Sequence, residues 1–218
     1  MTQKKDWIDV TGDTPKYDLS HFSYPDYYSE DIASILLPNG LILSRIDKLA
    51  RTIVSRYDKH LVVCCILKGG YQFFSDLSTA LKKYALIDGK NITFSEHFVR
   101  IQSYNNDQST GNVRISMSEE QLRDLEGKDV LIVEDLIDTG ASMVALSEFL
   151  KDYNLKSMSV ASLLVKDTVR SNGFTPEYVG FLVPDHFIIG YCIDYNDMFR
   201  ELNHVCTISE VGKKKYAK

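Results

Sequence analysis

The chain has 218 residues, of which 44% are hydrophobic, and this is enough for one globular domain with a substantial core. Its formal net charge of -5 argues against nucleic acid as a partner, because proteins that bind nucleic acid usually carry a basic surface. No apolar stretch approaches the roughly 20 residues that span a membrane, and the polar N-terminal segment is no signal peptide. We therefore expect neither a nucleic-acid partner nor a membrane partner.

The elements of the N-terminal half can be predicted from apolar spacing. Residues 1–35 are irregular and rich in tyrosine, and residues 42–53 then place apolar side chains at helical intervals. Residues 61–67 form a continuous apolar run, which is typical of a strand that is buried on both faces. We expect a helix over residues 71–84 and a further strand over residues 91–101.

The C-terminal half continues the alternation of strands and helices. Residues 103–118 are the longest polar segment, and we expect them to form a loop that is either a lid or a disordered segment. Residues 130–133 predict a second buried strand and residues 141–153 a helix, and two more strands are expected over residues 158–165 and 178–183. This alternation predicts an α/β fold, with a mostly parallel central sheet flanked by helices and ligands bound beyond the carboxyl ends of the strands.

The four cysteines indicate a reducing compartment. Cys64 and Cys65 lie inside an apolar run, where cysteine behaves as a small buried hydrophobe. Together with Cys192 and Cys206, they show neither CxxC spacing nor the density of a secreted disulfide scaffold. We therefore predict reduced thiols and a cytoplasmic location.

The segment that carries most chemistry is residues 130–142, VLIVEDLIDTGAS. Its apolar residues deliver two adjacent carboxylates, Glu134 and Asp135, to the end of a strand. The following residues turn into a helix, whose free backbone N–H groups can bind a phosphate. Carboxylates beside a phosphate fit the hydroxyl groups of a ribose, which donate hydrogen bonds to them. The alternative is an ordinary strand and helix with Asp138 or Thr139 as the N-cap, but a cap explains only one of these residues.

Residues 130–142 resemble the phosphoribosyl-pyrophosphate (PRPP) signature of the type I phosphoribosyltransferases. Other blocks resemble the members of this family that act on hypoxanthine and guanine, in the expected order from about residue 60 onwards. These blocks are LKGG at 67–70, SYNNDQSTG at 103–111, SLLVK at 162–166 and GYCIDYNDMFRELNHVC at 190–206. The resemblance implies a single domain over residues 1–218, with a core at about 36–185 and a small hood built from residues 1–35 and 186–218.

The resemblance also implies a reaction. The 5-phosphoribosyl group of PRPP would be transferred to N9 of hypoxanthine or guanine, giving IMP or GMP and pyrophosphate. The implied cofactor is Mg²⁺, and members of the family associate as homodimers or homotetramers. Two alternatives stay open: an enzyme for another base, such as adenine or orotate, and a non-catalytic relative that only binds a nucleotide or acts as a regulator.

The resemblance assigns roles within residues 130–142. Glu134 and Asp135 would contact the ribose hydroxyls, and Asp138 would be the general base that accepts the proton from N7 of the purine. The implied 5′-phosphate site comprises Asp138, Thr139, Gly140, Ala141 and Ser142. The family often has lysine at the position of Ala141, so one charged contact with the phosphate is missing here.

The remaining roles fall on segments outside the signature. Lys68, Gly69 and Arg200 would bind pyrophosphate, and the family can have a cis peptide bond before the first glycine, here between Lys68 and Gly69. On local sequence alone, Lys68-Gly69-Gly70 would be an ordinary turn from a strand to a helix. Ser103 and Tyr104 begin the polar segment and would help to close it over the site.

Five residues would surround the purine base: Lys166, His186, Phe187, Ile188 and Asp194. Lys166 would donate a hydrogen bond to O6, Phe187 would stack on the base, and the backbone of Ile188 would bind its Watson–Crick edge. Asp194 is also the implied magnesium ligand, together with Glu134 and Asp135. The alternative for Asp194 and Arg200 is an ordinary surface ion pair.

Overall fold

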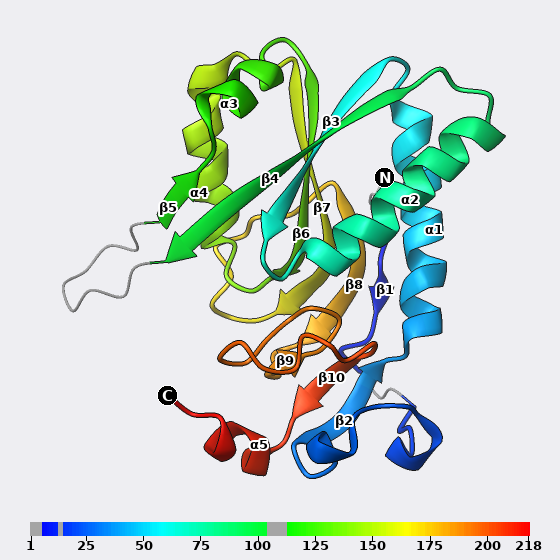
Figure 1. The fold of residues 1–218 in the computed structure, drawn as a ribbon, viewed down its shortest axis with the longest axis vertical. Coiled ribbons are helices and arrows are strands. Elements are labelled where there is room, and N and C mark those ends of the chain that lie inside the picture. The colour runs from blue at the N-terminus through cyan, green and yellow to red at the C-terminus, as the bar shows by residue number, and fades with distance from the viewer. Residues whose placement is uncertain (1–5, 13–14, 104–112) are drawn as a thin grey trace.

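The computed structural model describes residues 6–12, 15–103 and 113–218, and it contains two sheets (Figure 1). The large sheet has seven strands in the order β1-β8-β7-β6-β3-β4-β5. In chain order these strands are β1 (Ile8–Asp9), β3 (His60–Leu67), β4 (Thr93–Ser103), β5 (Val113–Ser116), β6 (Asp129–Ile137), β7 (Ser157–Asp167) and β8 (Tyr178–Pro184). Every neighbouring pair is parallel except β4 and β5, so the predicted α/β fold with a mostly parallel sheet is confirmed.

Helices cover both faces of the large sheet. On one face, α1 (Asn39–Arg56) and α2 (Tyr71–Ile87) enclose the larger apolar core. The opposite face is covered by α3 (Glu119–Leu125) and α4 (Ala141–Leu150), which enclose a second core. Because each central strand is buried against helices on two sides, it consists of an almost continuous apolar run, which is why these strands could be predicted from sequence.

The structure corrects the prediction for the polar segment. Residues 113–116 form β5 rather than a loop, and β5 pairs antiparallel with the end of β4. Ile115 and Met117 are partly buried against the second core and alternate with the exposed Arg114 and Ser116, so the segment has the period of two that a half-buried strand requires. The predicted helix over 141–153 is also shorter, since α4 ends at Leu150 and a 3-10 helix follows.

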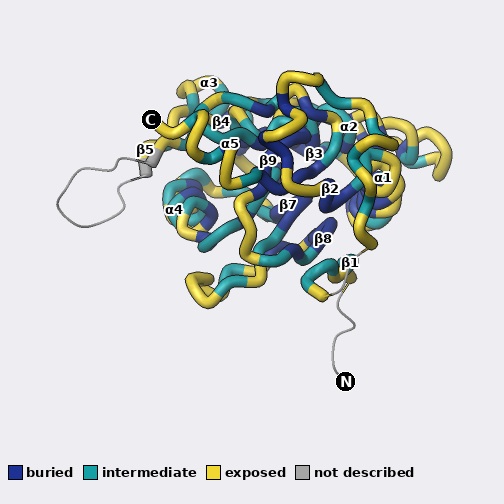
Figure 2. Tube along the Cα trace, turned by 90° about the horizontal axis from the view of Figure 1, so that it is seen from below, coloured by how far each residue is buried: buried dark blue, intermediate teal, exposed yellow. Residues whose placement is uncertain are grey.

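The small sheet consists of β2 (Ile32–Leu37), β10 (Val205–Ile208) and β9 (Ile188–Ile189). It joins segments from the two ends of the chain, although β2 extends to Leu37, beyond residue 35, and residues 8–9 pair with β8 in the large sheet. The buried carboxylate of Asp31 accepts hydrogen bonds from Lys215 and Tyr216 next to this sheet. Seen from below, the small sheet lies over the ends of the large one (Figure 2).

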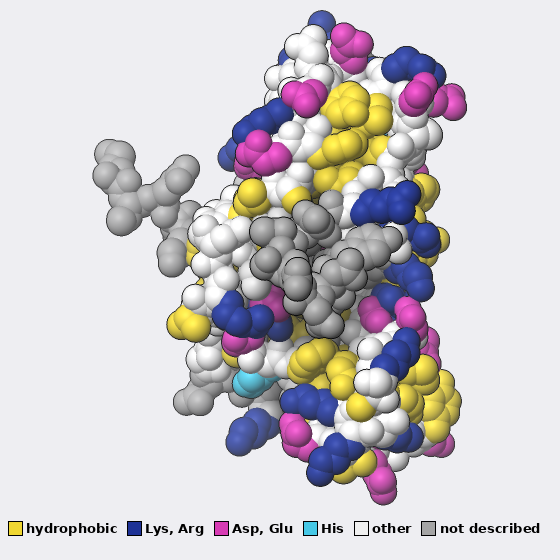
Figure 3. All heavy atoms as spheres, turned by 90° about the vertical axis from the view of Figure 1, so that its left-hand side faces the viewer, with side chains coloured by type: hydrophobic (Ala, Val, Ile, Leu, Met, Phe, Trp, Pro, Cys, Tyr) yellow, Lys and Arg dark blue, Asp and Glu magenta, His cyan; other side chains and the backbone are white. Residues whose placement is uncertain are grey.

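Acidic and basic side chains are interspersed over the described part of the face shown in Figure 3. None of the helices formed by the described residues is long and apolar enough to cross a membrane.

The strand order creates a switch point between β3 and β6. The chain runs from β3 to β4 on one side, whereas β6, β7 and β8 add to the other side. In sheets of this kind the loops that leave the carboxyl ends of the two central strands diverge, and ligands bind in the crevice between them. In Figure 1 these ends point toward β9 and β10.

A polar network that holds α3 against β4 yields a prediction for acid stability. Hydrogen bonds from Lys128 and His97 lower the pKa of Asp124 to about 2. Since this is below the ordinary value of 3.8, the carboxylate stabilises the fold above about pH 4, and the stabilisation is lost as the pH falls toward 2. We expect Asp124→Asn to lower the free energy of unfolding at pH 6 by about 1 kcal/mol, because the site is partly exposed and screened.

The measurement is urea unfolding of the wild type and the variant between pH 6 and pH 2. The difference between their free energies of unfolding should shrink steadily below about pH 4. Asp152→Asn serves as the control, because it removes the same charge from an exposed residue of the neighbouring 3-10 helix. A difference that stays constant down to pH 2 would contradict the role given to Asp124.

Candidate active site

The loops after β3 and β6 meet at the switch point. Backbone pairing of β6 with β3 ends at Val133, whereas pairing with β7 continues to Ile137. Glu134 and Asp135 therefore lie within β6, in the part of the strand that pairs with β7 but no longer with β3. The Asp135 carboxylate reaches the loop after β3: a Cβ atom on Gly69 would lie 2.1 Å from its Oδ2 atom.

The two adjacent acids share one environment. Glu134 is buried, at 8% exposure, and the backbone N–H of Asp135 donates a hydrogen bond of 3.2 Å to its Oε1 atom. Burial and the neighbouring Asp135 carboxylate raise the pKa of Glu134 well above its ordinary value. A buried carboxylate next to a second, partly exposed one is stabilised by hydrogen-bond donors or by a cation, which is the environment that ribose hydroxyls or a divalent ion would provide.

The turn after β6 enters α4 through a glycine. Gly140 is the N-cap of α4 and has a φ of 84°, a left-handed conformation that favours glycine. Gly140 has no side chain that could cap the helix, and Asp138 is not the cap, so the alternative given for Asp138 is removed. Thr139 Oγ1, the other cap offered above, accepts a long hydrogen bond of 3.4 Å from the N–H of Ala141. The turn lines a hollow of about 120 Å³ that also includes Glu134. The amide groups of the first helical turn are available to an anion there.

Asp138 belongs instead to a cluster of opposite charges. Arg170 Nη2 donates to Asp138 Oδ1 at 2.9 Å and to Asp185 Oδ1 at 3.0 Å. Lys166 Nζ lies 3.7 Å from an oxygen of each of the same two carboxylates, and its side chain is only 9% exposed. The hydrogen bond from Thr168 and the pair with Arg170 lower the pKa of Asp185. Sequence reasoning found Asp138 and Lys166 but missed Arg170 and Asp185.

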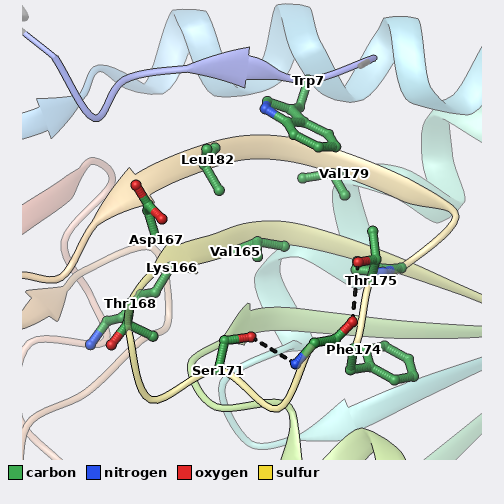
Figure 4. A pocket seen from close by; sticks show the side chains of 12 residues that line it. Trp7, Val165, Lys166, Asp167, Thr168, Ser171, Phe174, Thr175, Val179 and Leu182 are labelled. Atoms are coloured by element: carbon green, nitrogen blue, oxygen red, sulfur yellow. Dashed lines mark hydrogen bonds between the residues drawn. The ribbon is translucent and has the colours of Figure 1, made fainter. Parts of the chain in front are cut away.

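The cavity shown in Figure 4 borders this cluster but is not the predicted purine site. It has a volume of about 180 Å³ and lies between β7, β8 and the loop that follows β7, with Trp7 over Val179 at one side. Of the predicted site residues only Lys166 lines it. The other residues predicted to hold the base, Phe187 among them, do not line it.

The segment after β8 carries the other residues predicted to contact the base. Phe187 is half-exposed, and its ring lies perpendicular to that of Tyr195 at a centroid distance of 5.0 Å. Ile188 is buried in β9, where it pairs with β10. His186 is exposed, and the Asp194 carboxylate pairs with Arg200 at 2.7 Å. The ion pair that sequence analysis offered as the alternative for Asp194 is therefore present without ligand.

The two cations predicted to bind pyrophosphate lie close together. Lys68 Nζ and Arg200 Nη2 both contact Asp197 Oδ1, at 3.1 and 3.2 Å. The cis peptide bond joins Leu67 to Lys68, so it lies one residue before the position that we predicted. Asp197 carries no local signal by which the sequence would have indicated it.

Two predicted features can be placed only in part. Ser103 is the last residue of β4, while Tyr104 lies outside the described residues. Among the described residues there is no group of three or more metal-ligating side chains. The three carboxylates predicted as magnesium ligands, Glu134, Asp135 and Asp194, form no such group.

Similarity to known proteins, in sequence and in structure, identifies the family of this chain. Residues 33–196 match the model of the phosphoribosyl transferase domain. The chain belongs to the phosphoribosyltransferase family. It is 46% identical, over 99% of both chains, to the hypoxanthine-guanine phosphoribosyltransferases of Cricetulus griseus and Homo sapiens. A crystal structure of the hypoxanthine-guanine phosphoribosyltransferase of Schistosoma mansoni in complex with IMP matches this phosphoribosyltransferase with a TM-score of 0.83 and 34% identity, over 98% of this chain and 100% of the other.

The close approach of Gly69 and Asp135 provides a test of the site. In Gly69→Ala the new methyl group would collide with the Asp135 carboxylate, which can rotate away because its end is free to move. We expect little change in thermal stability but a loss of about tenfold to 100-fold in turnover, since a small displacement of a contact group is costly in catalysis. A phosphoribosyl-transfer assay and thermal unfolding measure the two quantities.

Gly40→Ala is the matched control, because a Cβ atom there meets nothing within 4 Å. It should leave both turnover and stability essentially unchanged. Turnover of Gly69→Ala equal to that of the wild type would show that the position of Asp135 is unimportant.

Proposed function

We propose that this protein is a hypoxanthine-guanine phosphoribosyltransferase, which transfers the 5-phosphoribosyl group of PRPP to N9 of a 6-oxopurine and releases pyrophosphate. The observation that carries the proposal is the placement of Lys166 against Asp138. A nearly buried ammonium and a carboxylate lie together where the phosphate turn begins. The ammonium would donate a hydrogen bond to O6, and the carboxylate would accept the proton of N7. O6 and N7 are adjacent on the same edge of hypoxanthine and guanine.

The ribose and phosphate would lie along β6 and its turn. Glu134 and Asp135 would accept hydrogen bonds from the ribose hydroxyls, and their charge would stabilise the positive charge that develops at C1′. Residues 138–142 would hold the 5′-phosphate, chiefly through the backbone amides of Thr139 to Ser142. Ala141 is exposed and contributes no charge, so this site depends on the amides and on the start of α4.

Asp138 would act as the general base. As N9 attacks C1′, the proton on N7 passes to the carboxylate, which Arg170 and Lys166 hold in a fixed orientation. Arg170 also binds Asp185, so it links the Asp138 carboxylate to the segment that leads to Phe187, the residue predicted to stack on the purine. The proton acceptor and the predicted purine-binding segment would therefore be positioned together.

Selection of the base would depend on Lys166. Its ammonium donates to O6 of a 6-oxopurine, whereas adenine presents an amino group there, so that two hydrogen-bond donors would face each other. Phe187 would stack on the base, and the backbone of Ile188 would bind its edge. His186 and Asp194 would complete this side of the site.

The pyrophosphate of PRPP would bind to Lys68, the backbone of Gly69 and Arg200. Bound Mg²⁺ would neutralise part of the substrate's charge, held by Asp194 and by the acids of β6. Ser103 and Tyr104 would help to exclude water from the closed site.

Two further features complete the proposal. We propose that the protein acts in the cytoplasm, where thiols stay reduced, since all four of its cysteines are free. We also propose that it works as a homodimer or homotetramer.

A spectrophotometric assay with Mg²⁺-PRPP and four bases tests the function. Hypoxanthine and guanine should be converted to IMP and GMP, and adenine should not react. Turnover of adenine alone would overturn the choice of substrate. Absence of turnover with hypoxanthine, guanine, xanthine and adenine would favour a protein that only binds nucleotides.

Asp138→Asn tests the assignment of the base. Asparagine keeps the size of the side chain but cannot accept the proton, so we expect turnover to fall by about 10² to 10⁴. Asp185→Asn is the control, because Asp185 contacts the same two cations without belonging to the phosphate turn. The loss of turnover in Asp185→Asn should be clearly smaller than that in Asp138→Asn. A loss below about tenfold in Asp138→Asn would contradict the role of Asp138.

A further inference from the structure

Asp197 lies at the tip of a tight turn next to the predicted pyrophosphate site. The backbone groups of Tyr195 and Met198 pair in both directions, at 3.2 and 3.1 Å. Between them Asn196 and Asp197 have φ values of 52° and 69°. Two successive left-handed residues define a turn that strongly favours asparagine, aspartate and glycine. The turn therefore fixes where the Asp197 carboxylate can reach.

That carboxylate binds both predicted pyrophosphate cations. Its Oδ1 atom lies 3.1 Å from Lys68 Nζ and 3.2 Å from Arg200 Nη2. Among the described residues Asp197 is the only acidic partner of Lys68. The hydrogen bond from Lys68, and next that from Arg200, lower the pKa of Asp197, so that the group is anionic at neutral pH. One carboxylate oxygen thus takes the place that a phosphate oxygen would need.

The surroundings make this contact exchangeable. The side chains of Lys68 and Asp197 are 59% and 58% exposed, so the ion pair between them is weak and accessible to solvent. Arg200 keeps a second anchor at 2.7 Å on Asp194 and a third on the carbonyl oxygen of Cys192. An arriving anion could therefore displace Asp197 while Arg200 stays in place.

We propose that Asp197 is an internal counter-ion that occupies the pyrophosphate-binding cations and is exchanged for the pyrophosphate group of the substrate. This inference rests on the proposed function. While no substrate is bound, Asp197 holds Lys68 and Arg200 together across two separate loops. Binding of PRPP breaks these pairs, and release of pyrophosphate restores them, so Asp197 weakens the binding of both anions.

Asp197→Asn tests the proposal directly. Asparagine favours the same left-handed turn but lacks the competing charge, so the fold is retained. We expect the dissociation constant of Mg²⁺-pyrophosphate, measured by isothermal titration, to fall by about 2- to 10-fold, the size of two exposed ion pairs. KM for PRPP and the inhibition constant of pyrophosphate should fall in parallel.

Two controls separate exchange from a general effect of charge. Glu210→Gln removes the same charge from an exposed residue that pairs with Lys213, and it should leave pyrophosphate affinity unchanged. In a Lys68→Met background, the gain from Asp197→Asn should be clearly smaller than in the wild type, because one of the two predicted pyrophosphate cations that Asp197 pairs with is gone. The third cationic neighbour of Asp197, Lys218 at 3.9 Å, is unchanged there. An undiminished gain there would show that Asp197 acts only through its long-range field, and would overturn the proposal.

The remaining outcomes are also decisive. If the wild type binds pyrophosphate and turns over but Asp197→Asn binds it equally or more weakly, Asp197 is an organiser of the site rather than a competitor, and the proposal fails while the function stands. If the wild type shows neither turnover nor pyrophosphate binding, the proposed function fails and this inference fails with it.

Discussion

The contact between Gly69 and the Asp135 carboxylate is the constraint on which the rest of the site depends. A side chain on Gly69 would have to occupy the space that the carboxylate fills, at 2.1 Å from its Oδ2 atom. Because glycine stands there, the loop after β3 can approach the end of β6 while the Asp135 carboxylate keeps its position. That approach brings the loop that carries Lys68 to the end of β6, although the two segments are far apart in the sequence.

The same packing creates two clusters in which charges of opposite sign balance without a ligand. On the predicted purine side, Lys166 and Arg170 face Asp138 and Asp185. On the predicted pyrophosphate side, Lys68 and Arg200 face Asp194 and Asp197. A site for a strongly anionic substrate needs cations, and unpaired cations would repel one another while the site is empty. Carboxylates of the protein itself remove that repulsion. When substrate binds, each of these carboxylates must either be displaced from its cation or contact the substrate.

Features that depend on neighbouring residues could be predicted from the sequence, whereas features that depend on contacts between distant segments could not. The apolar runs of β3 and β6 and the turn at residues 138–142 are local patterns, so their positions could be predicted. Arg170, Asp185 and Asp197 could not be found, because their importance lies in partners from other segments. β5 was missed since four residues carry too short a period of two, and the limits of β6 were misjudged because its pairing ends at different points on its two sides.

The phosphate turn shows how these features are connected. Gly140 begins α4 without a side-chain cap, and Ala141 adds no charge, so attraction for the 5′-phosphate comes mainly from backbone amides. Amides bind an anion without needing a counter-ion when it leaves, whereas the side-chain cations of the pyrophosphate side do need one. The reaction keeps the 5′-phosphate on its product and releases pyrophosphate. A fixed amide site on one side and exchangeable ion pairs on the other therefore match the group that stays and the group that departs.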